Sequence, residues 1–198
     1  MSRGQALVEF ALFVPLLLFM VVGATDISTL LDDHLNVVYA ARTGARVGSV
    51  IGSYSPTSAP YTADCAVIGA VQAALVNSPN VQVNWIAIYQ ADATGVYTSK
   101  SPQDRYPGSA VCNSDGTISQ PAIQTTWAPN TPRSTKPFLE DSLGVAINYT
   151  YTFQFNPLGV QFNPQGGGAF TATDSSVMPI EIVIGTPPAI TPPPTSTP

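Results

Sequence analysis

The N-terminal stretch MSRGQALVEFALFVPLLLFMVVGA, residues 1–24, decides how this chain is organised. Residues 5–24 form an apolar run that a single acid, Glu9, interrupts. At 1.5 Å of rise per residue, a helix over this run is roughly 30 Å long, which is the thickness of the hydrocarbon core of a bilayer. The run therefore predicts a transmembrane helix over residues 5–24, preceded by a short leader, residues 1–4.

Glu9 makes this helix an unusual membrane anchor. An unpaired carboxylate inside the bilayer costs about 2.5 to 3.5 kcal/mol, so we expect Glu9 to reach the membrane surface or to meet a positive partner. If the chain is cut after Gly4, Gln5 gains a new α-amino group, and Glu9 of a neighbouring subunit could pair with that group. A cleaved signal peptide and a simple membrane anchor are the alternatives, although the apolar run is longer than the usual 7 to 15 residues of a signal peptide.

The apolar periodicity continues beyond the membrane segment. Apolar residues recur at steps of three and four, which predicts an unbroken helix from Gln5 to about Ile51, with residues 25–52 as a helical stalk: Ile27, Leu30, Leu31, Leu35, Val38, Ala41 and Ala45. Pro15 should kink the helix slightly, because it removes one intrahelical hydrogen bond. Small residues four apart predict a packing edge, with a frayed helix end as the alternative reading: Ala40, Gly44, Gly48 and Gly52.

Two features of this region resemble a known family. They are the string RGQALVEFALFVPLLL at residues 3–18, with Glu9 and Phe10 as the fifth and sixth residues after Gly4, and the string AARTGARVGS at residues 40–49. Both resemble the TadE-like pseudopilins of the tight-adherence (Tad, or Flp) branch of type IV pili. The resemblance covers about the first 50 residues.

The resemblance has several implications for function. It implies a pilin-like α+β fold, cleavage between Gly4 and Gln5, and a role for Glu9 and Phe10 in assembly. The implied partners are other pilin subunits, a prepilin peptidase, the pilus assembly machinery and membrane lipid. The implied location is the inner membrane, followed by an extracellular pilus.

Composition restricts the role of the rest of the chain. Only 10% of the residues are charged and the net charge is −5, so the chain lacks the clustered Lys and Arg that nucleic-acid binding requires. Arg3 precedes the apolar run whereas Asp26, Asp32 and Asp33 follow it, which places the N-terminus in the cytoplasm by the positive-inside rule. The remainder, at residues 53–185, is long enough for one outward-facing domain with a modest core.

Within this domain the sequence predicts a long helix packed on a small antiparallel sheet. We expect a short helix over residues 65–76 and strands over residues 81–90, 145–156 and 180–184, with a weaker strand near residues 117–124. Val81, Val83 and Trp85 should share one face of the first strand. In the strand at 145–156 the strict alternation predicts one core face and one solvent face. Residues 186–198 are rich in Pro and Thr and should form an extended tail.

Cys65 and Cys112 are the only two cysteines, and both lie beyond the membrane segment on the predicted outer side. A disulfide between them is favoured there, because thiols oxidise outside the cytoplasm, with two buried free thiols as the alternative. The bridge would close a loop of about 48 residues and stabilise the domain by roughly 4 kcal/mol.

Catalytic patterns are scarce. His34 follows Asp32 and Asp33, but no third ligand stands three or four residues further on, so we expect no metal, and no other cofactor is indicated. We expect no enzyme, since a Ser-His-Asp set would have to use that same histidine. Two functions remain: a structural subunit of a Tad or type IV-like pilus, either a minor pilin or a pseudopilin, or a membrane-anchored adhesion or binding module with an exposed Tyr, Asn and Thr surface.

Overall fold

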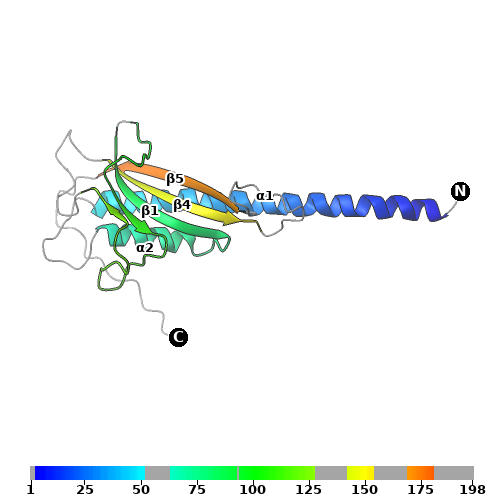
Figure 1. The fold of residues 1–198 in the computed structure, drawn as a ribbon, viewed down its shortest axis with the longest axis horizontal. Coiled ribbons are helices and arrows are strands. Elements are labelled where there is room, and N and C mark those ends of the chain that lie inside the picture. The colour runs from blue at the N-terminus through cyan, green and yellow to red at the C-terminus, as the bar shows by residue number, and fades with distance from the viewer. Residues whose placement is uncertain (1–2, 52–62, 93, 128–141, 154–168, 181–198) are drawn as a thin grey trace.

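The computed structural model describes residues 3–51, 63–92, 94–127, 142–153 and 169–180. Helix α1 spans Arg3–Ile51 without a break and continues through Pro15. Its first half projects away from the rest of the molecule, and its second half lies along the sheet (Figure 1). The long helix that the sequence predicts is confirmed: it contains both the apolar run at residues 5–24 and the stalk, in which apolar residues recur at steps of three and four.

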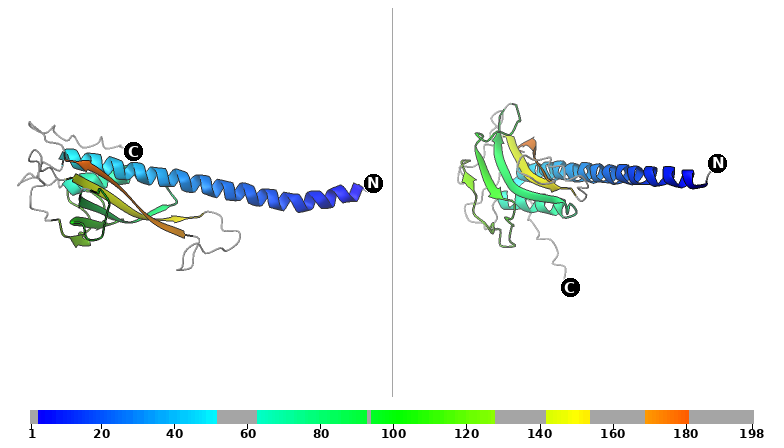
Figure 2. Two further views of the ribbon diagram at one scale, coloured as in Figure 1. Left: turned by 90° about the horizontal axis from the view of Figure 1, so that it is seen from above. Right: turned by 45° about the vertical axis from the view of Figure 1, so that its right-hand side comes forward.

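Five antiparallel strands form one sheet in the order β3-β2-β1-β4-β5. The strands span Val81–Ala91 (β1), Gln103–Pro107 (β2), Gln124–Thr125 (β3), Ser142–Thr152 (β4) and Ala169–Pro179 (β5). The short helix α2, Ala63–Leu75, lies beside α1 on the same side of the sheet (Figure 2). The α+β architecture is therefore confirmed.

The main core lies between the two helices and the sheet. Its fully buried members come from α1, α2, β1 and β4: Val37, Ala40, Ala41, Ala45, Val67, Ile68, Val71, Ile86, Ile88, Leu143, Val145 and Ile147. Tyr149 and Tyr151 extend this core along β4 toward the membrane segment. The core face that the alternation predicts is thus confirmed within β4, although this strand begins at Ser142 and ends at Thr152 rather than spanning 145–156, and residues 154–156 lie outside the described residues.

The prediction that the other face of the sheet is solvated is only partly correct. A second cluster on that face buries Ala87, Tyr89 and Ala146 completely, under Trp85 and Tyr97. Gly144 allows this packing, because a Cβ there would lie 2.2 Å from the Tyr89 ring.

The prediction that Trp85 shares a face with Val81 and Val83 is wrong. The register of β1 against β4 shifts between Val83 and Trp85, which is a β-bulge. Such an extra residue reverses the inside–outside alternation that follows it. Val81 and Val83 therefore contact the main core, whereas Trp85 lies on the opposite face.

Two strand predictions also need correction. The strand expected at 180–184 is instead β5, which ends at Pro179, and residues 181–184 lie outside the described residues. Near residues 117–124 there is only an isolated bridge between Cys112 and Ile118, and β3 begins at Gln124. β2 was not predicted, because QDRYP carries two charges and resembles a turn.

Candidate assembly helix and its packing surfaces

The N-terminal half of α1 is bare, in the sense that no other described part of the chain covers its side chains. By length and composition α1 is the one helix among the described residues that can cross a membrane, and none of its most apolar window, of mean hydropathy 2.5, is buried. Phe10 is 68% exposed, and its large apolar neighbours are exposed to a similar degree: Leu7, Val8, Leu12, Phe13, Leu16, Leu17 and Met20. An apolar surface of this size on an isolated chain requires a lipid or protein partner.

Glu9 lies on this bare segment with its side chain exposed among apolar neighbours. Gly4, the residue before the expected cleavage point, is in the first turn of the helix, and no atom lies within 4 Å of a Cβ built on it. Gln5 and Glu9 are four residues apart, which places them on the same side of the helix, roughly 6 Å apart along its axis. An amino group on Gln5 of a neighbour shifted by one turn would therefore be level with Glu9.

The small residues of the stalk lie against α2 and β4 of the same chain. A Cβ at Gly44 would approach Val71 Cγ2 to 2.7 Å, and one at Gly48 would approach Leu143 Cδ2 to 2.7 Å. Ala40 is fully buried. Gly52 lies outside the described residues. The absence of side chains at Gly44 and Gly48 thus lets the helix come this close to α2 and β4.

Polar contacts replace this close packing at the membrane-proximal end of the same interface. The hydroxyl groups of Thr29 and Tyr151 are hydrogen-bonded at 2.9 Å. Asn80 donates to Asp33 Oδ2 at 3.1 Å. The stalk is thus joined to the sheet by packing at one end and by hydrogen bonds at the other.

His34 makes the most extensive of these polar contacts. Its Nδ1 lies 3.0 Å from the Tyr149 hydroxyl oxygen and 3.2 Å from Asp174 Oδ2 on β5. Burial raises the pKa of Tyr149 above its usual value, and the negative charge of Asp174 raises that pKa further. The sequence predicts the strand that carries Tyr149 but not β5, so it gives no indication of the contact with Asp174.

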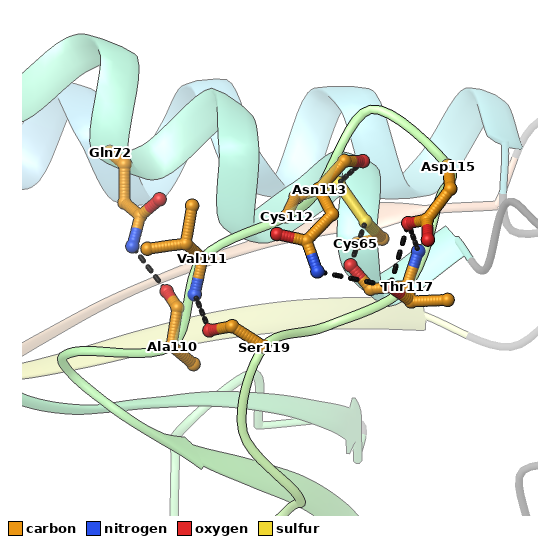
Figure 3. The surroundings of a disulfide bond; sticks show 9 residues. All are labelled: Cys65, Gln72, Ala110, Val111, Cys112, Asn113, Asp115, Thr117 and Ser119. Carbon is orange, nitrogen blue, oxygen red and sulfur yellow. Dashed lines mark hydrogen bonds between the residues drawn. A yellow bond between two sulfur atoms is a disulfide. The ribbon is translucent and has the colours of Figure 1, made fainter.

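A disulfide joins Cys65 of α2 to Cys112 in the segment that follows β2, as the sequence predicts (Figure 3). The same segment is fixed to α2 by a hydrogen bond from Gln72 Nε2 to the Ala110 carbonyl oxygen. A tight turn follows, in which the Thr117 amide donates to Asp115 Oδ1 at 2.9 Å. Hydrogen bonds from Thr117 lower the pKa of the exposed Asp115 carboxyl group. The bridge therefore anchors a long irregular segment to a helix of the core.

The outer face of the sheet carries polar and aromatic side chains. Asn84 donates to Asn148 Oδ1 at 2.8 Å and to Thr150 Oγ1 at 3.0 Å. Beside this group the Trp85 ring lies 5.6 Å from the Tyr97 ring, and the Arg105 guanidinium lies 5.5 Å from the Trp85 centroid. Among the described residues, no three His, Cys, Asp or Glu side chains lie close enough together to hold a metal ion.

Comparison with known proteins supports the resemblance seen in the sequence. Residues 4–46 match the model of a family described as TadE-like protein, and this match lies wholly within α1. No curated protein and no solved structure matches the chain. The similarity to TadE-like proteins is therefore confirmed over residues 4–46 of α1.

Proposed function

We propose that the chain is a structural subunit of a Tad or type IV-like pilus, either a minor pilin or a pseudopilin. The subunit is first inserted in the inner membrane and is then incorporated into a filament. One observation carries the proposal: the segment that matches TadE-like proteins is a helix whose first half is apolar and bare while its second half is built into a folded domain. This arrangement suits a subunit that exchanges lipid contacts for contacts with its neighbours.

The proposal assigns roles to the N-terminal residues. A prepilin-type peptidase cuts between Gly4 and Gln5 at the cytoplasmic face, and the new ammonium group pairs with Glu9 of a neighbour. In a low-dielectric setting such a pair offsets part of the cost of burying each charge, whereas a lone Glu9 bears that cost in full. Phe10 contributes apolar contact area beside the pair.

Substitution of Glu9 tests this role. Glu9→Ala removes the carboxylate, so we expect the variant to insert into the membrane at the wild-type level and to appear in surface filaments at about a tenth of that level or less. Leu12→Ala is a matched control on the same bare segment, since Leu12 is 72% exposed and carries no charge. Filaments that contain as much of the Glu9→Ala variant as of wild type would refute the pairing.

A membrane-anchored adhesion or binding module is the second candidate. The group around Trp85 and the neighbouring Asn and Thr side chains on the outer face of the sheet support it. The tyrosines of β4 do not contribute to such a surface, because Tyr149 and Tyr151 are buried against α1. The two candidates differ in one observable: an adhesion module stays in the membrane fraction when filaments are sheared from cells, whereas a pilus subunit leaves with them.

A further inference from the structure

The stalk half of α1 keeps one apolar line exposed although its other side is packed on the sheet. Ile27, Leu31, Leu35 and Tyr39 are 59%, 56%, 63% and 64% exposed. Their spacing of four residues places them on one face of the helix. We refer to these four residues as the outer stripe. The stripe lies just beyond the membrane segment, where lipid no longer covers it.

Three exposed charges accompany the outer stripe. Asp32 directly follows Leu31 near the middle of the stripe, and Arg42 and Arg46 follow its distal end. At 3.6 residues per turn, Arg46 lies roughly 40° around the helix from Asp32, so these charges share the exposed arc with the stripe. In the described part of the chain no ion pair engages any of the three. The chain has only seven Lys and Arg in total, so two of them on this one face are a notable concentration.

These charges discriminate between two ways of placing a second, parallel copy on this face. Copies at the same level bring Asp32 beside Asp32 and each arginine beside its own equivalent, and such like-charge contacts are unfavourable. A copy shifted outward by ten residues brings its Asp32 level with Arg42, and a shift of fourteen brings it level with Arg46. These shifts correspond to about 15 and 21 Å along the helix.

The apolar residues agree with the shifted arrangement. With a shift of ten residues, Leu31 of one copy is level with Val21 of the other, and Ile27 is level with Leu17. Val21 and Leu17 are 51% and 62% exposed and belong to the bare half of α1. The outer stripe of one copy then covers membrane-segment residues of the next copy. Apolar surface thus meets apolar surface where opposite charges also meet.

We propose that the outer stripe, with Arg42 and Arg46, is the docking surface for α1 of a second copy that is parallel and shifted outward by about 15 to 21 Å. This inference rests on the proposed function. The shift is about half of the hydrocarbon thickness or more, so the second copy has partly left the membrane. The charges therefore disfavour level pairs in the membrane and favour the stepped arrangement of a growing filament.

Cross-linking of the full-length chain tests the stepped arrangement. Copies that carry Asp32→Cys are co-expressed with copies that carry Arg42→Cys or, in a second experiment, Arg46→Cys, and sheared filaments and membranes are treated with a short bismaleimide. The native cysteines do not react, because they form a disulfide. We expect a dimer between the two variants in filaments, at least tenfold more than in membranes. Each variant expressed alone should give no dimer above background.

Two outcomes overturn the inference, and only the second of them also refutes the proposed pilus function. If the chain is present in filaments but neither the 32-to-42 nor the 32-to-46 dimer forms, or if Asp32→Cys alone gives as much dimer, the stepped arrangement is wrong and the pilus function stands. If the chain is absent from filaments altogether, the proposed function fails as well.

A charge exchange provides an independent arm of the test. The double variant Arg42→Asp, Arg46→Asp should lower the amount of chain in filaments at least tenfold, and adding Asp32→Arg should restore at least half of it. All three positions are exposed, so unchanged thermal unfolding of the variants will show that the domain is intact. Failure of the third substitution to restore filaments would contradict the pairing of these charges.

Discussion

Gly48→Leu is the sharpest test of how the stalk is joined to the domain. A Cβ at Gly48 would lie 2.7 and 3.0 Å from the two methyl carbons of Leu143 and 3.0 Å from Val67 Cγ2. Leu143 and Val67 are both fully buried, so neither side chain has free space to move into. Replacing Gly by a better helix former contributes about 1 kcal/mol of stability. Overpacking a full core costs typically 1 to 3 kcal/mol, and a whole leucine side chain belongs at the upper end of that range.

The net loss for Gly48→Leu is therefore about 2 kcal/mol, whereas Gly48→Ala should stay within about 1 kcal/mol of wild type. For a chain of this size, 2 kcal/mol corresponds to a fall in Tm of about 4 to 8 °C. The assay is thermal unfolding of the full chain in detergent micelles, followed by near-ultraviolet circular dichroism. Gly23→Leu is the control, because no atom lies within 4 Å of a Cβ at Gly23. If Gly48→Leu melts at the wild-type temperature, the close packing of stalk and domain is wrong.

Three further predictions concern the domain. Replacing both Cys65 and Cys112 by Ser should lower the free energy of unfolding by about 4 kcal/mol in the chain-entropy model, and mass spectrometry of freshly prepared wild type under non-reducing conditions should find no free thiol. Domain stability should fall as the pH rises above about 10, because tyrosine ionises there in the unfolded chain while the raised pKa of Tyr149 keeps it protonated in the fold. Tyr149→Phe should make this fall shallower in urea titrations between pH 9 and 11, and an unchanged slope would count against the burial of that hydroxyl group. Thr29→Val should cost about 1 kcal/mol through loss of the hydrogen bond to Tyr151, whereas an unaltered urea midpoint would show that this bond adds nothing.

The elements that the sequence predicts well are those whose own residues carry a clear pattern of apolar positions. In α1 an apolar run and then apolar residues at steps of three and four predict one long helix. Only some of the stepped residues, such as Ala41 and Ala45, contact the domain, whereas Ile27, Leu31 and Leu35 stay exposed. In β4 every second residue faces the helices. The disulfide followed from there being only two cysteines.

The elements that escaped prediction are those whose environment is set by distant parts of the chain. In β5 the residues paired with core positions of β4 include Ala172, Asp174 and Ser176, which are small or polar because α1 packs on this strand and supplies His34. The residues of β5 therefore do not alternate between apolar and polar in the way that predicts a strand. The face of Trp85 depends on a β-bulge, which a period of two cannot reveal.

The same distinction applies to the candidate site. Glu9 could be selected from the sequence because it interrupts the apolar run, and Gly4 because of the resemblance to TadE-like proteins. The small residues of the stalk could be selected because a spacing of four places them on one face of a helix. The contacts of Asp33 and His34 with the sheet could not, since their partners lie far along the chain. The outer stripe emerged only when the packing of α1 showed which of its apolar residues stay exposed.

Analysis of the chain recovered from sheared surface filaments tests the central claim most directly. Intact mass and N-terminal sequencing of this material should show that the chain is present and begins at Gln5, with a mass that includes one disulfide. A chain that is absent from the filaments, or that is present with Met1 or Ser2 at its N-terminus, would contradict the account.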